Sequence, residues 1–159
     1  MMAMSYADKP LKLHFAKGQF LYEENGSKVL DCINNVSHIG HCHPYYVMQL
    51  NSQNTRLLTN SRFLYDELMT ATQKILKKLP KELCVVTFVN SGSEANDLAM
   101  QMAEIHTGKS GVICFDGAYH GITRKCTEVS PYKWSEYYKK PAGTKVAPSP
   151  CFYRGPFKD

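Results

Sequence analysis

The sequence predicts an α/β fold with a mostly parallel sheet, because an apolar strand, an amphipathic helix and a second apolar strand follow one another. Residues 84–89 are apolar and rich in β-branched side chains, which is typical of a strand buried on both faces. A helix is expected to follow, and residues 111–115 form another short apolar run. Together they would make one right-handed βαβ unit.

The helix of this unit has recognisable start and stop signals. Ser91 is followed three residues later by Glu94, which fits a capping box, and Gly108 is expected to end the helix. Apolar residues recur at helical spacing between these ends, at Ala95, Leu98, Ala99, Met102 and Ile105.

The turn before this helix has the composition of an anion site. Gly92 has no side chain to block a ligand, Ser93 adds a hydroxyl, and the first N–H groups of a helix have no partner within it. We therefore expect residues 90–97 to hold a phosphate. An ordinary capped helix without a ligand is the alternative interpretation.

A second loop, residues 116–121, is expected at the same edge of the sheet. It follows the strand at 111–115, and ligands of parallel sheets bind beyond the carboxyl ends of the strands. Tyr119 could stack there on a flat cofactor, with His120 shaping the turn. Packing in the core or exposure at the surface is the alternative for both.

Upstream, the pattern predicts a hairpin and two helices. Residues 19–23 and 28–33 should pair around Asn25 and Gly26, a strong hairpin signal. Helices are expected from Pro44 towards Leu58 and over residues 63–79, before Pro80. The second helix has one apolar stripe for packing, formed by Leu64, Leu68, Ala71, Ile75 and Leu79. Residues 132–150 are expected to be a mobile, irregular connection.

Composition excludes several classes of function. The formal net charge is +5, but the lysines are scattered, which indicates a solvated surface and no nucleic-acid interface. No apolar run reaches the roughly 18 residues of a membrane span. The first nine residues have neither a signal-peptide core nor an Arg-rich transit helix.

Six cysteines are present without a Cys-x-x-Cys pair, so we expect reduced thiols in an intracellular protein. Cys84 and Cys114 fall in the two predicted strands and are expected to be buried there. A zinc site is conceivable where metal-ligating residue types crowd together, but the spacing lacks a finger pattern and no second pair follows. No metal is therefore expected at His38, His41, Cys42 and His43.

The two loops together resemble the class III aminotransferase family of pyridoxal-phosphate enzymes. The resemblance rests on Ser-Gly-Ser-Glu-Ala-Asn at residues 91–96 and Ala-Tyr-His-Gly at residues 118–121. Other segments are most similar to the branch of phospholyases acting on ethanolamine phosphate or 5-phosphohydroxylysine. Gly117 departs from that branch, where a histidine is expected. The branch-like segments are residues 30–44, 59–64, 130–133, 147–150 and 153–156.

The resemblance implies a fold-type-I transferase with pyridoxal 5′-phosphate as cofactor. Residues 1–80 would form the amino-terminal segment, and residues 81–159 the start of the large cofactor-binding domain. The cofactor would lie on Gly92, Ser93, Tyr119 and His120. The substrate candidates are Ser37 in the stretch 34–37, Asn60, Arg62 and Arg154.

The implied reaction is the elimination of phosphate and ammonia from a phosphorylated amine. A transaminase is the alternative, and so is a noncatalytic fragment. In the resembled family, the Schiff-base lysine and the acid that pairs with the pyridine nitrogen lie far downstream of the Tyr-His-Gly loop, so the resemblance implies that both lie beyond Asp159. Lys109, Lys125 and Lys145 match no Schiff-base motif. The chain alone would then be inactive. The family also implies a homodimer or homotetramer, mitochondrial by resemblance and cytoplasmic otherwise.

Overall fold

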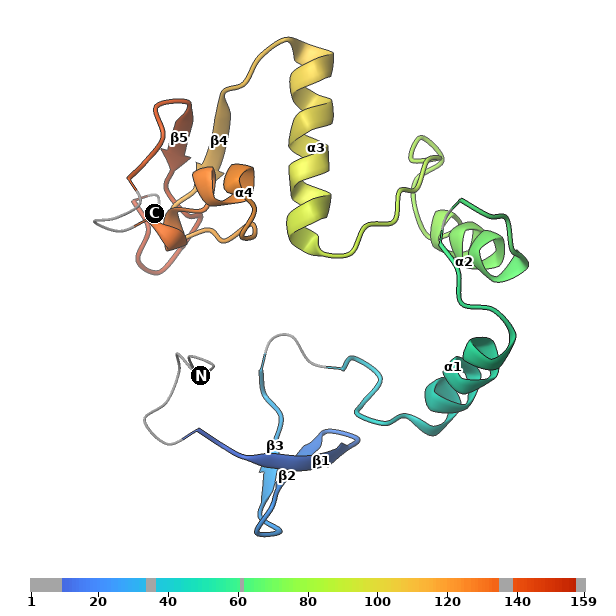
Figure 1. Ribbon diagram of the computed structural model, residues 1–159. Coiled ribbons are helices and arrows are strands. Elements are labelled where there is room, and N and C mark those ends of the chain that lie inside the picture. Colours follow the sequence, from blue (N-terminus) through green and yellow to red (C-terminus); the bar gives the residue numbers. More distant parts are fainter. Residues whose placement is uncertain (1–9, 34–36, 61, 135–138, 157–159) are drawn as a thin grey trace. The chain divides into compact units, whose positions relative to one another are not determined.

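A computed structural model describes residues 10–33, 37–60, 62–134 and 139–156 (Figure 1). The chain divides into two compact units, Met1–Ala71 and Thr72–Asp159, and each contains its own sheet. A domain boundary between residues 80 and 81 stays a prediction.

The first unit contains a three-stranded antiparallel sheet in the order β1-β2-β3. The strands are β1 (Leu13–Lys17), β2 (Phe20–Glu23) and β3 (Lys28–Leu30). The predicted hairpin is confirmed, and its turn is closed by Asn25, whose Oδ1 accepts the N–H of Ser27 at 2.8 Å. Strand β1 was not predicted, although its own residues alternate between apolar and polar side chains.

Two helices follow this sheet along the chain. Helix α1 (Pro44–Arg56) begins with proline at its first position, as the sequence predicts. Helix α2 (Asp66–Leu76) is shorter than the predicted 63–79. Its end tightens because the N–H groups of Lys78 and Leu79 bond to carbonyls three residues back instead of four.

The second unit is built on a parallel pair of strands. Helix α3 (Gly92–Thr107) precedes β4 (Val112–Phe115), which pairs in parallel with β5 (Thr144–Ala147). The connection between the strands contains α4 (Arg124–Glu128) and a 3-10 turn, η1 (Pro131–Lys133). The α/β class with a parallel sheet is thus confirmed.

Two predicted elements of this unit are wrong. Residues 84–89 form no strand, because no other described segment supplies a ladder of hydrogen bonds to them. Residues 132–150 are not wholly irregular, since η1 and β5 lie within them. The short strand β5 was missed because prolines, glycine and lysines surround its four residues.

The buried core of the second unit is small and lies where α4 approaches the sheet. Cys114 on β4, Cys126 on α4 and Val129 are its buried apolar residues, and burial raises the pKa of the Cys114 thiol. The predicted burial of Cys84 is wrong, since its segment is unpaired and exposed. The apolar stripe of α3 is also uncovered, with Ile105 85% exposed.

Candidate functional site

The start of α3 is fixed by its own side chains. The Ser91 hydroxyl accepts the N–H of Glu94 at 3.2 Å, and Gly108 ends the helix in a left-handed conformation, both as predicted. The Glu94 carboxylate accepts the backbone N–H of Asn90 at 2.7 Å and its side-chain amide at 3.1 Å. The reciprocal half of the capping box therefore reaches one residue further back than expected.

The first two N–H groups of α3 are available to a ligand. The Gly92 and Ser93 N–H groups bond to no acceptor within the part of the chain that the structure describes. A Cβ built on Gly92 would meet no atom within 4 Å, so the space beside this N–H is open. Together with the positive end of the helix dipole, these donors favour an anion.

The loop after β4 folds against this helix start, as expected, although residues 84–89 before the helix form no strand. The Ile122 N–H donates to the Ser93 Oγ at 3.1 Å. Gly121 lies so close that a Cβ there would stand 2.5 Å from the same oxygen. Because Ser93 Oγ accepts from Ile122, its own hydroxyl hydrogen can be donated to a ligand.

Tyr119 presents its ring at the surface of this loop. The ring is 54% exposed and meets Tyr132 edge to face, with centroids 6.1 Å apart. The Lys133 ammonium lies 5.4 Å from the centroid of each ring. Lys133 was missed as a site residue, although it belongs to the branch-like segment 130–133 that follows the loop closely in the sequence.

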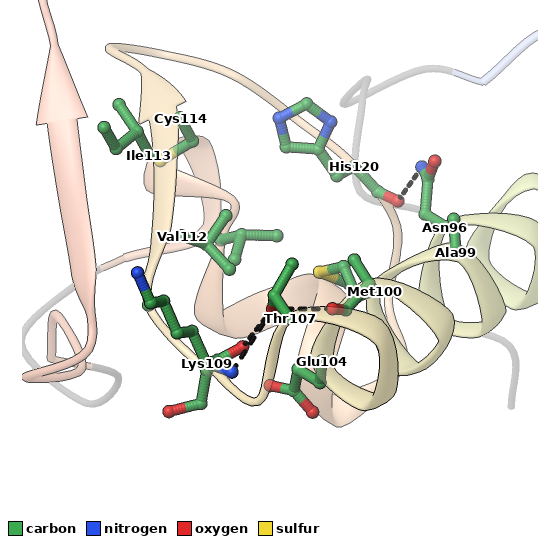
Figure 2. A pocket seen from close by; sticks show the side chains of 14 residues that line it. Asn96, Ala99, Met100, Glu104, Thr107, Lys109, Val112, Ile113, Cys114 and His120 are labelled. Carbon is green, nitrogen blue, oxygen red and sulfur yellow. Dashed lines mark hydrogen bonds between the residues drawn. The ribbon is translucent and has the colours of Figure 1, made fainter.

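The backbone of His120 is hydrogen-bonded to Asn96 and Ser130, and its side chain faces a cavity. Its ring helps to line a cavity of about 560 Å³ between α3 and β4, with Asn96 and Met100 on the helix side (Figure 2). Neither Gly92, Ser93 nor Tyr119 lines this cavity. Of the four predicted cofactor residues, only His120 lines this cavity, while Gly92 and Ser93 lie at the helix start outside it.

Charged residues tie α3 to α4 beside the site. The Glu104 carboxylate accepts a hydrogen bond from Lys125 and raises the pKa of that ammonium. A hydrogen bond from Gln101 lowers the pKa of the Asp97 carboxyl, with a further contribution from Thr123. The Asp97 carboxyl therefore favours its ionised form on the face of α3 towards α4.

In the first unit, Ser37 lies beside a hydrogen-bonded pair of His41 and Asp31. The His41 Nε2–H donates to the Asp31 Oδ2 at 2.7 Å, and this bond holds the pKa of the Asp31 carboxyl below its ordinary value. The Ser37 hydroxyl lies 3.4 Å from the His41 Nδ1. Residues 34–36 of the predicted stretch are outside the described residues.

The other substrate candidates divide between the units. Asn60 Oδ1 accepts the N–H of Arg62 at 3.0 Å in the first unit. In the second unit, the Arg154 N–H donates to the Cys151 Sγ at 3.2 Å. Both arginines are exposed, and neither guanidinium has a carboxylate partner among the described residues. Each can therefore receive an anion without first breaking an ion pair.

The described ranges contain neither a metal cluster nor a membrane-spanning helix. No three metal-ligating side chains gather there, including those of the segment around His41. No helix in the same ranges is both long and apolar enough to cross a membrane.

The profile of the class-III aminotransferase family matches residues 1–159, and the chain belongs to this family. Pyridoxal phosphate is the cofactor of the class. The chain is 46% identical over 156 residues to a Drosophila melanogaster protein named alanine–glyoxylate aminotransferase 2-like, covering 97% of this chain and 32% of the relative. It is 41% identical over 152 residues to the Caenorhabditis elegans ethanolamine-phosphate phospho-lyase homolog 1, covering 94% and 32%.

Solved structures agree on the fold. An Arthrobacter phospholyase in complex with phosphoethanolamine superposes with a TM-score of 0.84 at 30% identity, over 90% of this chain and 34% of that one. An amine transaminase from an uncultivated Pseudomonas species, in its pyridoxal-phosphate-bound form, gives 0.82 at 22% identity, over 99% and 39%. The fold-type-I class is confirmed. The chain spans about a third of the length of the curated relatives it matches.

Proposed function

We propose that this chain supplies the cofactor-phosphate turn of a pyridoxal-phosphate-dependent phospholyase. The observation that carries the proposal is the meeting of two loops: donors at the start of α3 and the exposed ring of Tyr119 belong to segments joined at Ser93. The similarity to a phospho-lyase homolog and to a phospholyase with phosphoethanolamine supports the choice of reaction.

The cofactor phosphate would bind the N–H groups of Gly92 and Ser93 and the Ser93 hydroxyl. Open space beside Gly92 fits a phosphate oxygen, and the half-exposed ring of Tyr119 offers a face for stacking. His120 would contribute through its backbone. When bound, the cofactor supplies an electron-accepting ring for the electrons left by the substrate Cα proton.

The substrate phosphate would be met by Arg62 or Arg154. The chain has four arginines, and two of them are already paired: Arg56 with Glu67 at 3.0 Å and Arg124 with Glu128 at 3.5 Å. An unpaired guanidinium can grip a phosphate with two parallel hydrogen bonds. Ser37 and the Asn60 amide are proposed as further polar groups of the substrate pocket.

In the proposed reaction, the substrate loses its phosphate by cleavage of the carbon–oxygen bond and then takes up one water. Each phosphorylated amine thus gives one carbonyl product, one ammonia and one inorganic phosphate. No second substrate is needed, whereas a transaminase must restore its cofactor with a keto acid.

The test uses the full-length protein that carries this sequence. Ethanolamine phosphate and 5-phosphohydroxylysine are supplied in turn without a keto acid, and phosphate and ammonia are measured. We expect equal amounts of both from one of the two substrates, and a larger loss with Arg62→Ala or Arg154→Ala than with Arg56→Ala. Dependence on a keto acid with no phosphate release would overturn the proposal.

A class-III transaminase is the second candidate. It is favoured by the higher identity to the aminotransferase 2-like protein of Drosophila melanogaster. The keto-acid requirement described above distinguishes the two reactions.

The 159-residue polypeptide by itself is proposed to be inactive. None of its lysines stands in a sequence context typical of the covalent cofactor link. With pyridoxal phosphate and borohydride, we expect no stoichiometric adduct at a single lysine. Recovery of one specific modified lysine, with turnover, would contradict this.

For the full-length protein we propose a homo-oligomer, a dimer or a tetramer. A mitochondrial location is proposed from the human relative named alanine–glyoxylate aminotransferase 2, mitochondrial, which is 37% identical over 161 residues. Light scattering of the purified protein and fractionation of cells would test these two points.

A further inference from the structure

His120, the residue after Tyr119, forms hydrogen bonds through both its backbone N–H and its carbonyl. Both partners are side chains distant in the sequence. The His120 N–H donates to the Ser130 Oγ at 2.9 Å, and the His120 carbonyl accepts from the Asn96 Nδ2 at 2.8 Å. Figure 2 draws the second of these bonds, from the helix to the loop. Both donor–acceptor distances are in the usual range for protein hydrogen bonds.

The partners of His120 are themselves fixed. Ser130 is fully buried, and its hydroxyl donates to the Cys126 carbonyl at 2.6 Å, which leaves the oxygen oriented to accept from His120. Asn96 lies on α3, one helical turn after Ser93. Its side chain therefore joins the loop to the same helix start that carries the proposed phosphate donors.

The next two residues continue this attachment without using Asn96 or Ser130. Gly121 packs against Ser93, and the Ile122 N–H donates to the Ser93 Oγ. The two hydrogen bonds of the His120 backbone thus restrain Tyr119 as well, because Tyr119 is the adjacent residue in the chain. On the other side of Tyr119, the Ala118 carbonyl accepts a longer bond from the Tyr132 N–H, at 3.2 Å. Loss of the two bonds at His120 would therefore leave the ring held on one side, with more freedom to move while the contact at Ser93 persists.

We infer that Asn96 and Ser130 are positioning residues that hold the Tyr119 ring at a fixed place relative to the donors of Gly92 and Ser93. The inference rests on the proposed cofactor site, since it gives the fixed ring its purpose. Neither side chain needs to touch the cofactor. They act by restricting the backbone of one residue, so the ring is ordered before binding and less entropy is lost on binding.

The chain offers a matched control for each substitution. Asn96→Leu removes the amide donor at similar size, and Gln101→Leu removes an amide on the same helix that bonds only to Asp97 at 3.0 Å. Ser130→Ala removes a buried hydroxyl, and Thr144→Val removes another that donates to the Glu128 carbonyl at 2.9 Å. Only the first member of each pair holds His120.

Two measurements on the full-length protein test the inference. Hydrogen exchange of the cofactor-free protein reports the order of residues 117–122, and titration with pyridoxal phosphate gives the dissociation constant. Unfolding temperatures are recorded for all four variants. We expect Asn96→Leu and Ser130→Ala to speed exchange in the loop and to weaken cofactor binding about fivefold to tenfold, with both controls unchanged.

Wild-type exchange in Asn96→Leu would overturn the inference, because the bond would then not hold the loop. Faster exchange with unchanged cofactor affinity would also overturn it, since the fixed ring would then serve no binding role. Tyr119→Ala separates this failure from that of the proposed site: if Tyr119→Ala also binds the cofactor normally, the placement of the cofactor is wrong.

Discussion

Two helices of this chain begin in different ways, although both expose backbone at their amino-terminal ends. Helix α1 begins with Pro44, which has no N–H, and its N-cap His43 makes no side-chain cap bond. Helix α3 begins with Gly92, is capped by Ser91, and carries a hydroxyl at Ser93 that contacts another loop.

The difference shows what an anion site requires beyond a helix dipole. Both helix starts have a dipole and N–H groups that precede the first intrahelical bond. Helix α3 differs in beginning with a glycine that has open space beside it and in contacting a loop that carries an aromatic ring. The contact between Ser93 and the loop at Gly121 is the feature that α1 lacks among the described residues. Substitutions at these positions test whether the contact with the loop makes α3 an anion site.

The largest effect is expected from Gly121→Ala. A Cβ would stand 2.5 Å from the Ser93 Oγ and 2.8 Å from its Cα, so the loop must move away from α3. Loss of stacking, about 1 kcal/mol, and of a charged hydrogen bond, about 1.5–3 kcal/mol, would weaken cofactor binding about a hundredfold. Titration with pyridoxal phosphate measures this.

Gly117→Ala is the control for that experiment. Gly117 also has a positive φ, +68°, but a Cβ there would meet no atom within 4 Å. The Gly117→Ala variant therefore has only the backbone strain of an alanine at positive φ, and it should keep most of the cofactor affinity. Equal losses in the two variants would show that backbone strain, and not the contact with Ser93, explains the effect.

Tyr119→Ala should weaken cofactor binding by about tenfold, because stacking contributes about 0.5–1.5 kcal/mol beyond burial. The absorption of the bound cofactor should shift as well. Tyr119→Phe keeps the ring and should behave nearly as wild type. A large loss in the Phe variant would indicate a role for the hydroxyl instead.

The two helix caps should differ in their effect on stability. Ser91→Ala removes the bond to the Glu94 N–H and should lower the free energy of unfolding by about 1 kcal/mol. His43→Ala removes no cap bond and should stay within about 0.5 kcal/mol. Urea unfolding of both variants tests this, and equal losses would contradict the assigned caps.

The smallest effect concerns the hydrogen-bonded pair of Asp31 and His41 before α1. The folded-state pKa of Asp31 is lowered by His41, so the pair stabilises the folded state above the unfolded pKa of about 3.9. That stability is lost as the pH falls through the lower folded-state pKa. Asp31→Asn should reduce this acid dependence of unfolding, and an unchanged pH profile would argue against the pair.

The helix ends and the hairpin turn are predicted well from the sequence, because their causes lie within a few residues. Ser91, Gly108, Asn25 and Pro44 act through bonds or backbone preferences within a few residues, and their elements form as expected. The meeting of the phosphate turn with the loop at Gly121 was also expected, but the reason given for it is wrong, because residues 84–89 before the turn form no strand.

Pairing and burial are not local, and there the expectations are wrong. The run at residues 84–89 has the composition of a strand, but a strand needs a partner and no other described segment provides one. Cys84 is exposed for the same reason. The ties from Asn96 and Ser130 to His120 join residues 24 and 10 positions apart, and no periodicity indicates them.

Gly92→Val shows whether the start of α3 binds the cofactor phosphate. A side chain at Gly92 would enter open space, so the folded protein should keep its unfolding temperature. The same side chain would stand where the phosphate approaches the N–H groups. Titration of the full-length variant should show cofactor affinity reduced at least tenfold with stability unchanged, whereas wild-type affinity would contradict the account.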